Sequence, residues 1–240
     1  MTISVQKLAE WIREEVAAAH AKGVVFGLSG GIDSTVVGAL CHRALPKTAV
    51  GVCMPCYSHE KDLEHARTAA ACLGFPLRTV PLDDVFNALS IVLPKGGCDT
   101  GDERLVWGNL KSRLRMTVLY CLANQVNYLV VGSSNRSELA IGYFTKYGDG
   151  AADILPLGNL LKGEVRALAM ELDVPREIID KPPSAGLWPG QTDEEELGFT
   201  YEQLDRYLAG CGVEEGVRRK IEALCERSAH KRRMAPIPSF

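Results

Sequence analysis

The chain has 240 residues, of which 46% are hydrophobic and 24% are charged, and its formal net charge is -3. This composition is ordinary for a soluble globular protein, and the length suits one large α/β domain over residues 1–240. A nearly balanced charge excludes a global attraction to nucleic acid or to an anionic membrane, so any basic site must be local.

The start of the chain has no signal-type apolar core, and no apolar run in the sequence is long enough to cross a bilayer. Most of the eight cysteines lie within apolar stretches, where a free thiol behaves as a small hydrophobic side chain. We therefore expect a cytoplasmic protein that contacts no membrane and, in that reducing compartment, forms no disulfides.

Apolar residues recur at helical spacing from Val5 to Ala19, which predicts an opening amphipathic helix that Gly23 stops. The apolar run 24–28 predicts a strand, and residues 34–45 predict the next helix. The same alternation continues with strands expected at 49–55, 76–82 and 127–132, and with helices expected at 58–74 (capped by Ser58 and closed by Gly74), 83–92, 106–125 and from 134 onward.

Strands that alternate with helices predict a parallel, doubly wound, Rossmann-like sheet with right-handed crossovers. Residues 142–160 and 181–198 are rich in Gly, Pro and aromatics and are expected to form long loops or short turns. Residues 201–229 are expected to form a helical C-terminal part. Ligands of such sheets bind at the carboxyl ends of the strands, which is where "GLSGG" and "VGSSNRSE" lie.

The segment "SGGIDS", residues 29–34, joins the first strand to its helix. Gly30 and Gly31 allow the backbone to approach a phosphate, and the helix N-terminus adds partial positive charge. Asp33 fits such a site only if a cation, for which Mg²⁺ is suited, lies between it and the phosphates. The segment is neither G-x-x-x-x-G-K-[ST] nor G-x-G-x-x-G. A tight turn capped by Asp33 or Ser34 is the alternative interpretation.

The string "SGGIDS" resembles the pyrophosphate-binding loop of the ATP pyrophosphatases, which cleave ATP between its α and β phosphates. The resemblance implies ATP contacts along the loop, at Gly27, Leu28, Ser29, Gly30, Gly31, Ile32, Asp33 and Ser34. It implies that pyrophosphate is held by residues 29–34.

Further segments extend the resemblance over nearly the whole chain. They are "GNLKSRLRMTVLY", "VVGSSNRSELAIGYFTKYGDGAADILPLGNLLK", "KPPSAGLWPGQTDEEELG" and "HKRR". Together they resemble the short, ammonia-dependent NAD synthetases. This resemblance implies amidation of deamido-NAD by ammonia through an acyl adenylate, with release of NAD, AMP and pyrophosphate.

The resemblance also implies roles for individual residues. Asp33 and Glu138 match the positions that hold Mg²⁺, and Asp33 and Lys162 are the expected catalytic residues. Ser133, Lys162 and Ser184 match ATP contacts, although many relatives have Thr in place of the two serines. The positions that match deamido-NAD contacts are Arg113, Lys146, Asp153, His230 and Lys231.

Each of these residues has a simpler interpretation when taken alone. Glu138 fits an acid in the first turn of a helix, Arg113 fits a surface salt bridge, and Lys162 fits a solvated lysine. The basic run 230–233 fits a solvated tail or a nucleic-acid-binding patch. On charge alone, Arg104, Arg115 and Arg136 could serve as well as Arg113.

The resemblance implies a homodimer. Because the length leaves no room for a glutaminase domain, we expect the chain to use free ammonia. A separate glutaminase partner is one source of that ammonia. The alternative function is a tRNA-modifying ATP pyrophosphatase that uses Cys53 and Cys56. A nucleotide-binding sensor without turnover is a third hypothesis. The chain carries no appended RNA-binding module, so we expect no nucleic-acid partner.

Overall fold

The computed structural model describes residues 4–94, 102–188 and 190–240. Its centre is a parallel sheet in the order β3-β2-β1-β4. The strands are β1 (Gly23–Gly27), β2 (Ala49–Cys53), β3 (Leu77–Thr79) and β4 (Tyr128–Val131). Val25 of β1 pairs with Val50 on one side and with Val130 on the other. The predicted parallel, doubly wound α/β fold is therefore confirmed.

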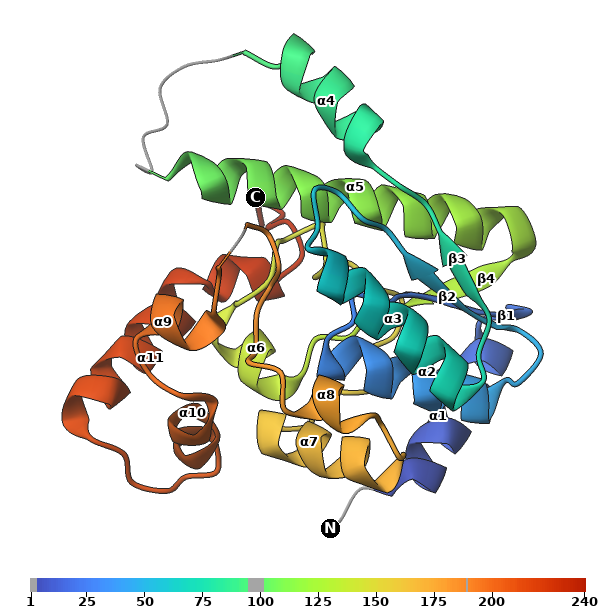
Figure 1. Ribbon diagram of the computed structural model, residues 1–240. Coiled ribbons are helices and arrows are strands. Elements are labelled where there is room, and N and C mark those ends of the chain that lie inside the picture. Colours follow the sequence, from blue (N-terminus) through green and yellow to red (C-terminus); the bar gives the residue numbers. More distant parts are fainter. Residues whose placement is uncertain (1–3, 95–101, 189) are drawn as a thin grey trace.

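Helices cover both faces of this sheet (Figure 1). Up to residue 171, the longer helices are α1 (Val5–Ala18), α2 (Ile32–Ala44), α3 (Glu60–Leu73), α4 (Asp83–Val92), α5 (Glu103–Val126) and α7 (Lys162–Glu171). Helix α2 packs between α1, α3 and α7 on one face, while α5 packs against β1 and β4 on the other.

The central strand is buried on both faces because its side chains alternate between two hydrophobic clusters. Val24 and Phe26 belong to the cluster formed with α1, α2 and α7, whereas Val25 belongs to the cluster beneath α5. The ring of Phe26 contacts Phe75 edge-on at 5.4 Å between centroids. Burial of each such side chain contributes roughly 1.5–3 kcal/mol to folding.

The predicted helix boundaries need three corrections that tertiary contacts explain, and α5 also begins at Glu103 instead of 106. Helix α1 ends at Ala18, and the chain turns at His20 (φ 52°), not at Gly23. Gly23 instead begins β1, where a Cβ would lie 2.3 Å from the carbonyl oxygen of Thr48. Helix α2 begins at Ile32, two residues earlier than expected, so the "IDS" of the loop forms its first turn.

The third correction concerns the start of α3. The N-cap is His59, whose Nδ1 accepts a hydrogen bond from the Lys61 amide at 3.2 Å. The hydroxyl of Ser58 turns the other way and accepts from the amide of Cys56 at 3.2 Å. Gly74 closes the helix as predicted, in the left-handed conformation.

After β4 the chain leaves the sheet and forms short elements. They are α6 (Arg136–Ile141), α8 (Arg176–Ile179), α9 (Asp193–Leu197), α10 (Tyr201–Leu208), α11 (Glu215–Arg227) and the 3-10 helix η1 (Ala229–Arg232). Residues of α6, α9, α10 and α11 share a separate hydrophobic cluster around Leu204 and Ile221. Among the described residues, no helix is both long and apolar enough to span a membrane.

Candidate active site

The loop predicted to bind phosphate lies between β1 and α2. The amide of Leu28 still donates to Val52 of β2 at 2.9 Å, so the loop leaves the sheet directly after it. The hydroxyl of Ser34 donates to the carbonyl oxygen of Gly31 at 3.0 Å and accepts from the amide of Ser29 at 3.2 Å. The first amides of α2 have no acceptor within the helix, so this turn can bind an anion.

Only glycine fits at position 30 of this loop, because of the backbone conformation there and the packing of α3. Its φ is +78°, and a Cβ there would lie 2.3 Å from the carbonyl oxygen of Asp62 in α3. Gly31 differs, because its φ is −92° and the nearest atom to a Cβ would be the Ser29 hydroxyl oxygen at 3.4 Å. The packing of α3 therefore requires Gly30, whereas the space over Gly31 is open toward a ligand.

Three charged side chains from separate elements meet beside this loop. The ammonium of Lys162, at the start of α7, contacts Asp33 Oδ2 at 2.5 Å and Glu138 Oε1 at 3.2 Å. The side chains are 12% exposed for Lys162 and 16% exposed for each carboxylate. Lys162 is thus not the solvated lysine of the simpler interpretation, and Glu138 is more than a helix-terminal acid.

Two hydrogen-bond networks hold this cluster in place. Asn135 donates from Nδ2 to Asp33 Oδ1 at 2.9 Å, and its Oδ1 accepts from the amide of Glu138 at 3.0 Å in a capping box. Asp205 of α10 accepts from the amides of Lys162 and Gly163 at 3.3 and 2.8 Å. The starts of α6 and α7 are therefore fixed relative to the loop by residues outside the predicted site.

The electrostatics of the cluster are dominated by its burial. Burial raises the pKa of Glu138 to about 8, although Lys162 opposes this shift and Asp33 adds to it. For Lys162, burial opposes the charged form, but the two carboxylates outweigh it and raise the pKa of the ammonium. The ring of Tyr201 lies 4.9 Å from the ammonium nitrogen and adds a cation–π contact.

The donor set fits Mg²⁺. Oxygens of Asp33 and Glu138 converge on one point, which the lysine nitrogen takes in this structure. Carboxylate oxygens are the ligands that Mg²⁺ prefers, usually together with phosphates and water. No group of three or more His, Cys, Asp or Glu residues suited to a metal occurs in the part of the chain that the structure describes. Two carboxylates would therefore need ligand oxygens from phosphates.

The two predicted serine contacts with ATP lie in different surroundings. Ser133 follows β4 and is partly exposed. Ser184 is exposed and lines a cavity of about 1220 Å³ between the start of α3 and residues 177–188 and 190–192. Lys181 and Asp62 also line this cavity, and the ion pair between them, with 2.5 Å between nitrogen and oxygen, ties Lys181 to α3.

Four of the five residues predicted to bind the dinucleotide lie around one loop. Lys146 donates from Nζ to the carbonyl oxygens of His230 and Arg233 at 2.7 and 3.2 Å. Lys231 donates to those of Gly142 and Phe144, at 2.8 and 2.7 Å. Lys231 is thus not part of a solvated tail, since it closes the C-terminal segment onto residues 142–146, whereas His230, Arg232 and Arg233 are exposed.

The other two predicted dinucleotide contacts, Arg113 and Asp153, lie in different surroundings. Arg113 is exposed and donates to the carbonyl oxygen of Lys146 at 3.4 Å, so it joins the same group. Asp153 faces the sheet, where its carboxylate accepts from the amide of Val130 at 2.7 Å and from the hydroxyl of Tyr120 at 3.1 Å. No hydrogen bond joins Asp153 to the other four among the described residues.

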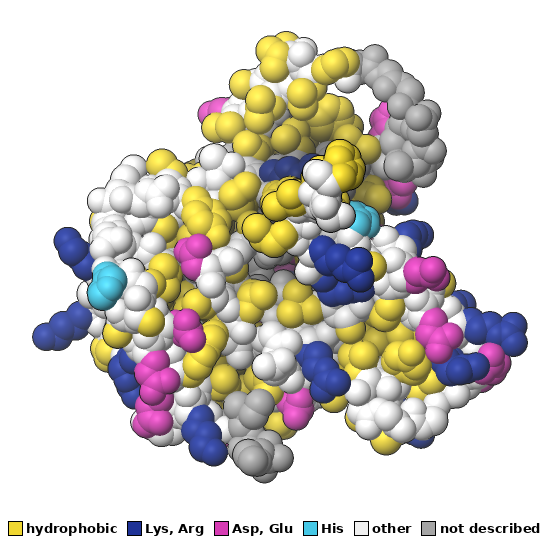
Figure 2. All heavy atoms as spheres, turned by 180° about the vertical axis from the view of Figure 1, so that it is seen from behind, with side chains coloured by type: hydrophobic (Ala, Val, Ile, Leu, Met, Phe, Trp, Pro, Cys, Tyr) yellow, Lys and Arg dark blue, Asp and Glu magenta, His cyan; other side chains and the backbone are white. Residues whose placement is uncertain are grey.

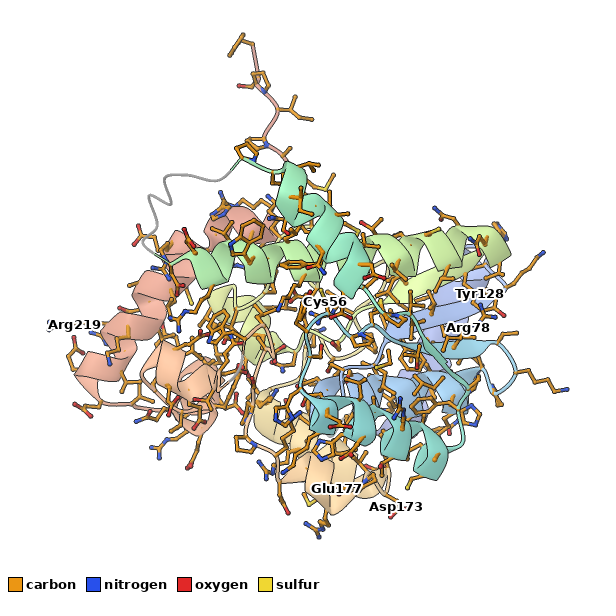
Figure 3. The ribbon with its side chains drawn as sticks, turned by 45° about the horizontal axis from the view of Figure 1, so that its top comes forward. Cys56, Arg78, Tyr128, Asp173, Glu177 and Arg219 are labelled. Atoms are coloured by element: carbon orange, nitrogen blue, oxygen red, sulfur yellow. The ribbon has the colours of Figure 1, made fainter. Side chains whose placement is uncertain are left out.

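Cys53 and Cys56 are both buried free thiols in the hydrophobic clusters. Burial raises the pKa of each thiol, which disfavours the reactive thiolate. In Figure 3, Cys56 lies in the middle of the molecule, near α4 and α5. This environment is typical of packing cysteines and gives no support to sulfur transfer. The seven described cysteines are free thiols; Cys98 lies outside the described residues.

Residues 4–235 match the family model described as NAD synthase. The chain belongs to the NAD synthase family. It is 47% identical over 234 residues to the "NH(3)-dependent NAD(+) synthetase" of Carboxydothermus hydrogenoformans, covering 97% of this chain and 96% of that one.

Solved structures of the family have the same fold. The NMN synthetase from Francisella tularensis superposes with a TM-score of 0.92 at 39% identity, covering 98% of this chain and 97% of that one. The NH3-dependent NAD synthetase from Campylobacter jejuni superposes with a TM-score of 0.79 at 31% identity, covering the same shares of the two chains.

Proposed function

We propose that this member of the NAD synthase family is an ammonia-dependent ligase that converts deamido-NAD, ATP and ammonia into NAD, AMP and pyrophosphate. The observation that carries the proposal is the convergence of Asp33, Glu138 and Lys162 beside the anion-binding turn at residues 29–34. NAD synthesis itself is supported by the similarity to curated relatives over nearly the whole chain.

Each part of the site has a role in this reaction. The amides of residues 29–34 bind the β and γ phosphates of ATP, which leave as pyrophosphate. Asp33 and Glu138 would hold Mg²⁺, which supplies Lewis-acid charge at the phosphates when bound. Lys162 exchanges a carboxylate oxygen for a phosphate oxygen and stabilises the charge that develops at the α-phosphorus.

The reaction has two covalent steps. A carboxylate oxygen of the nicotinate group bonds to the α-phosphorus, and the bond from that phosphorus to the oxygen bridging to the β phosphate breaks. Pyrophosphate leaves with the electron pair, which gives an acyl adenylate. The nitrogen of ammonia then bonds to the acyl carbon, the bond to AMP breaks, AMP leaves with its electron pair, and one proton passes from nitrogen to water.

The second candidate is amidation of the mononucleotide acid to give NMN. The observation that favours it is the structural similarity to the NMN synthetase from Francisella tularensis, whose TM-score exceeds that of the Campylobacter NAD synthetase. Both candidates use the same loop, carboxylates and lysine. They differ only in whether the adenylate half of the dinucleotide is required.

The test is a product assay with purified protein, ATP, Mg²⁺ and ammonium, supplied with either deamido-NAD or nicotinic acid mononucleotide. We expect NAD, AMP and pyrophosphate in equal amounts from deamido-NAD, with a higher kcat/KM than for the mononucleotide. A higher kcat/KM for the mononucleotide supports the second candidate. Absence of amide product from both acids contradicts the proposed function.

We also propose that the chain forms a homodimer through α4 and α5. Helix α4 has no buried residue, and Ile91 and Val92 are 76% and 73% exposed. Figure 2 shows hydrophobic side chains gathered at the top of the molecule, where Figure 1 places α4. A second copy would cover them. Light scattering of wild type and Ile91→Glu tests this contact, with a dimer expected for the first and a monomer for the second. A monomeric wild type contradicts it.

A further inference from the structure

Two cations lie one turn apart on the first half of α5, and the proposed reaction gives them no role. Lys111 and Arg115 are both partly buried and both lie against the segment that follows β2. In Figure 1 the N-terminal part of α5 extends beyond the strands of the sheet. Met54 directly follows the end of β2, so the bond from Arg115 to its carbonyl oxygen places the pair at the ligand-binding edge, on the α5 side of the sheet.

The surroundings of the pair are polar and aromatic. Arg115 donates from Nε to the carbonyl oxygen of Met54 at 3.1 Å and from Nη2 to the hydroxyl of Ser58 at 3.3 Å. Lys111 donates to the carbonyl oxygen of Leu187 at 3.1 Å and lies 5.8 and 5.6 Å from the rings of Tyr57 and Phe86. The two cations thus join the end of β2 to the segment that contains Ser184.

Neither cation has a carboxylate partner. Among the residues that the structure describes, no ion pair is formed by Lys111 or by Arg115, although Lys162 and Lys181 nearby both have one. Like charges at positions i and i+4 of a helix repel each other. Burial lowers the pKa of both groups, and the charge of Arg115 lowers that of Lys111 further.

A protein that keeps two unpaired, partly buried cations side by side loses stability unless an anion completes the arrangement. We propose that Lys111 and Arg115 form a phosphate-binding subsite at the carboxyl end of β2, which receives a phosphate group of one of the two nucleotide substrates. Nε and Nη2 of the Arg115 fork already donate to Met54 and Ser58, so among the described residues its Nη1 donors and its charge are left for a phosphate oxygen, and Lys111 offers a point charge. The hydroxyl of Ser58 lies beside the fork.

This inference rests on the proposed function for the identity of the nucleotides, and its test measures binding without turnover. Calorimetric titrations use α,β-methylene-ATP with Mg²⁺ in one arm, and deamido-NAD or nicotinic acid mononucleotide in the other. Lys111→Met keeps the alkyl contact with Tyr57 and Phe86 but removes the charge. Arg115→Lys keeps the charge but removes the fork. Arg219→Gln, on α11 and paired with Glu215 away from the site, is the control.

We expect Lys111→Met to weaken binding in one arm by about tenfold, which identifies the nucleotide whose phosphate is bound. Arg115→Lys should weaken binding in the same arm, and Arg219→Gln should leave both arms unchanged. The melting temperature of ligand-free Lys111→Met should equal or exceed that of wild type, because repulsion is relieved.

Two results would overturn the inference. One is unchanged affinity in both arms for Lys111→Met and Arg115→Lys. The other is a lowered melting temperature of ligand-free Lys111→Met with equal loss in both arms, which shows that the lysine is structural. If nucleotides bind as described but no amide product forms in the separate assay, the proposed function fails and the phosphate subsite stands.

Discussion

The amide nitrogen of Asn135 donates to Asp33 Oδ1 at 2.9 Å, across 102 positions of sequence. The same side chain accepts from the amide of Glu138 and so begins α6. One asparagine therefore orients the two carboxylates that we propose as the Mg²⁺ ligands. Because each carboxylate is fixed by this residue and by Lys162, the cluster is organised before any nucleotide binds.

Asn135→Ala should lower both activity and stability. Loss of the cap costs about 1 kcal/mol, and loss of an orienting partner of metal ligands typically costs about 10–100-fold in activity or metal affinity. Asn135→Ser is the matched variant, since serine keeps the cap but is too short to hold Asp33. Thermal melts and Mg²⁺-dependent kcat separate the two effects. Full activity of Asn135→Ser at limiting Mg²⁺ would show that Asp33 needs no such support.

Lys162→Met should change metal binding and turnover in opposite directions. The ammonium takes the point on which the two carboxylates converge, so its removal should tighten Mn²⁺ binding to the nucleotide-free protein by about tenfold or more. Turnover should fall by about a hundredfold or more, because charge stabilisation at phosphorus is lost. Electron paramagnetic resonance of free Mn²⁺ measures the first effect. Weaker Mn²⁺ binding by the variant would contradict this arrangement.

The two glycines of the loop should respond differently to alanine. Gly30→Ala places a Cβ against the carbonyl oxygen of Asp62 at a positive φ, so the free energy of unfolding should fall by at least about 1–2 kcal/mol. Gly31→Ala should cost less than about 1 kcal/mol but should weaken ATP binding, because its methyl lies toward the anion. Urea unfolding and ATP titration give the comparison. Equal stability losses would refute the distinction.

Asp193 should give the chain a pH-dependent stability. Asp193 is 4% exposed, and burial raises the pKa of its carboxyl above the usual 3.8, although Tyr201, Lys162 and Tyr143 oppose the shift. The folded state then binds more protons than the unfolded state between the two pKa values, so this contribution is full below the usual pKa and is lost as pH rises through the native pKa.

The variant Asp193→Asn isolates this effect, because asparagine has the same shape and does not titrate. The free energy of unfolding of wild type minus that of Asp193→Asn should decrease from about pH 4 toward neutrality and then become constant. Urea unfolding at several pH values measures this difference. A difference that rises over the same range would show that the tyrosine bonds outweigh burial.

The order of strands and helices follows from local patterns, which is why α4 and most of the sheet agree with the sequence prediction. The boundaries that differ depend on tertiary contacts. Gly23 is required by the approach of Thr48, and Ser58 turns toward Cys56 and Arg115 instead of capping α3. Neither contact is visible in a window of neighbouring residues.

The candidate site likewise combines residues that local sequence patterns indicate with residues that only tertiary contacts bring into place. Asn135 followed by Glu138 is a capping-box pattern, so the sequence contained a signal for Asn135 that we did not use. Tyr201 and Asp205 reach Lys162 from α10, about forty residues later in the chain. Their contribution depends on how α10 packs against α6 and α7, which no short motif encodes.

The central claim is that the substrate carboxylate attacks the α-phosphorus of ATP beside the loop at residues 29–34. Deamido-NAD labelled with ¹⁸O in its carboxylate tests this claim most directly, with mass spectrometry of the phosphorus-containing products. We predict that one labelled oxygen is transferred to AMP and that pyrophosphate is unlabelled. Formation of ADP and labelled inorganic phosphate would contradict the account.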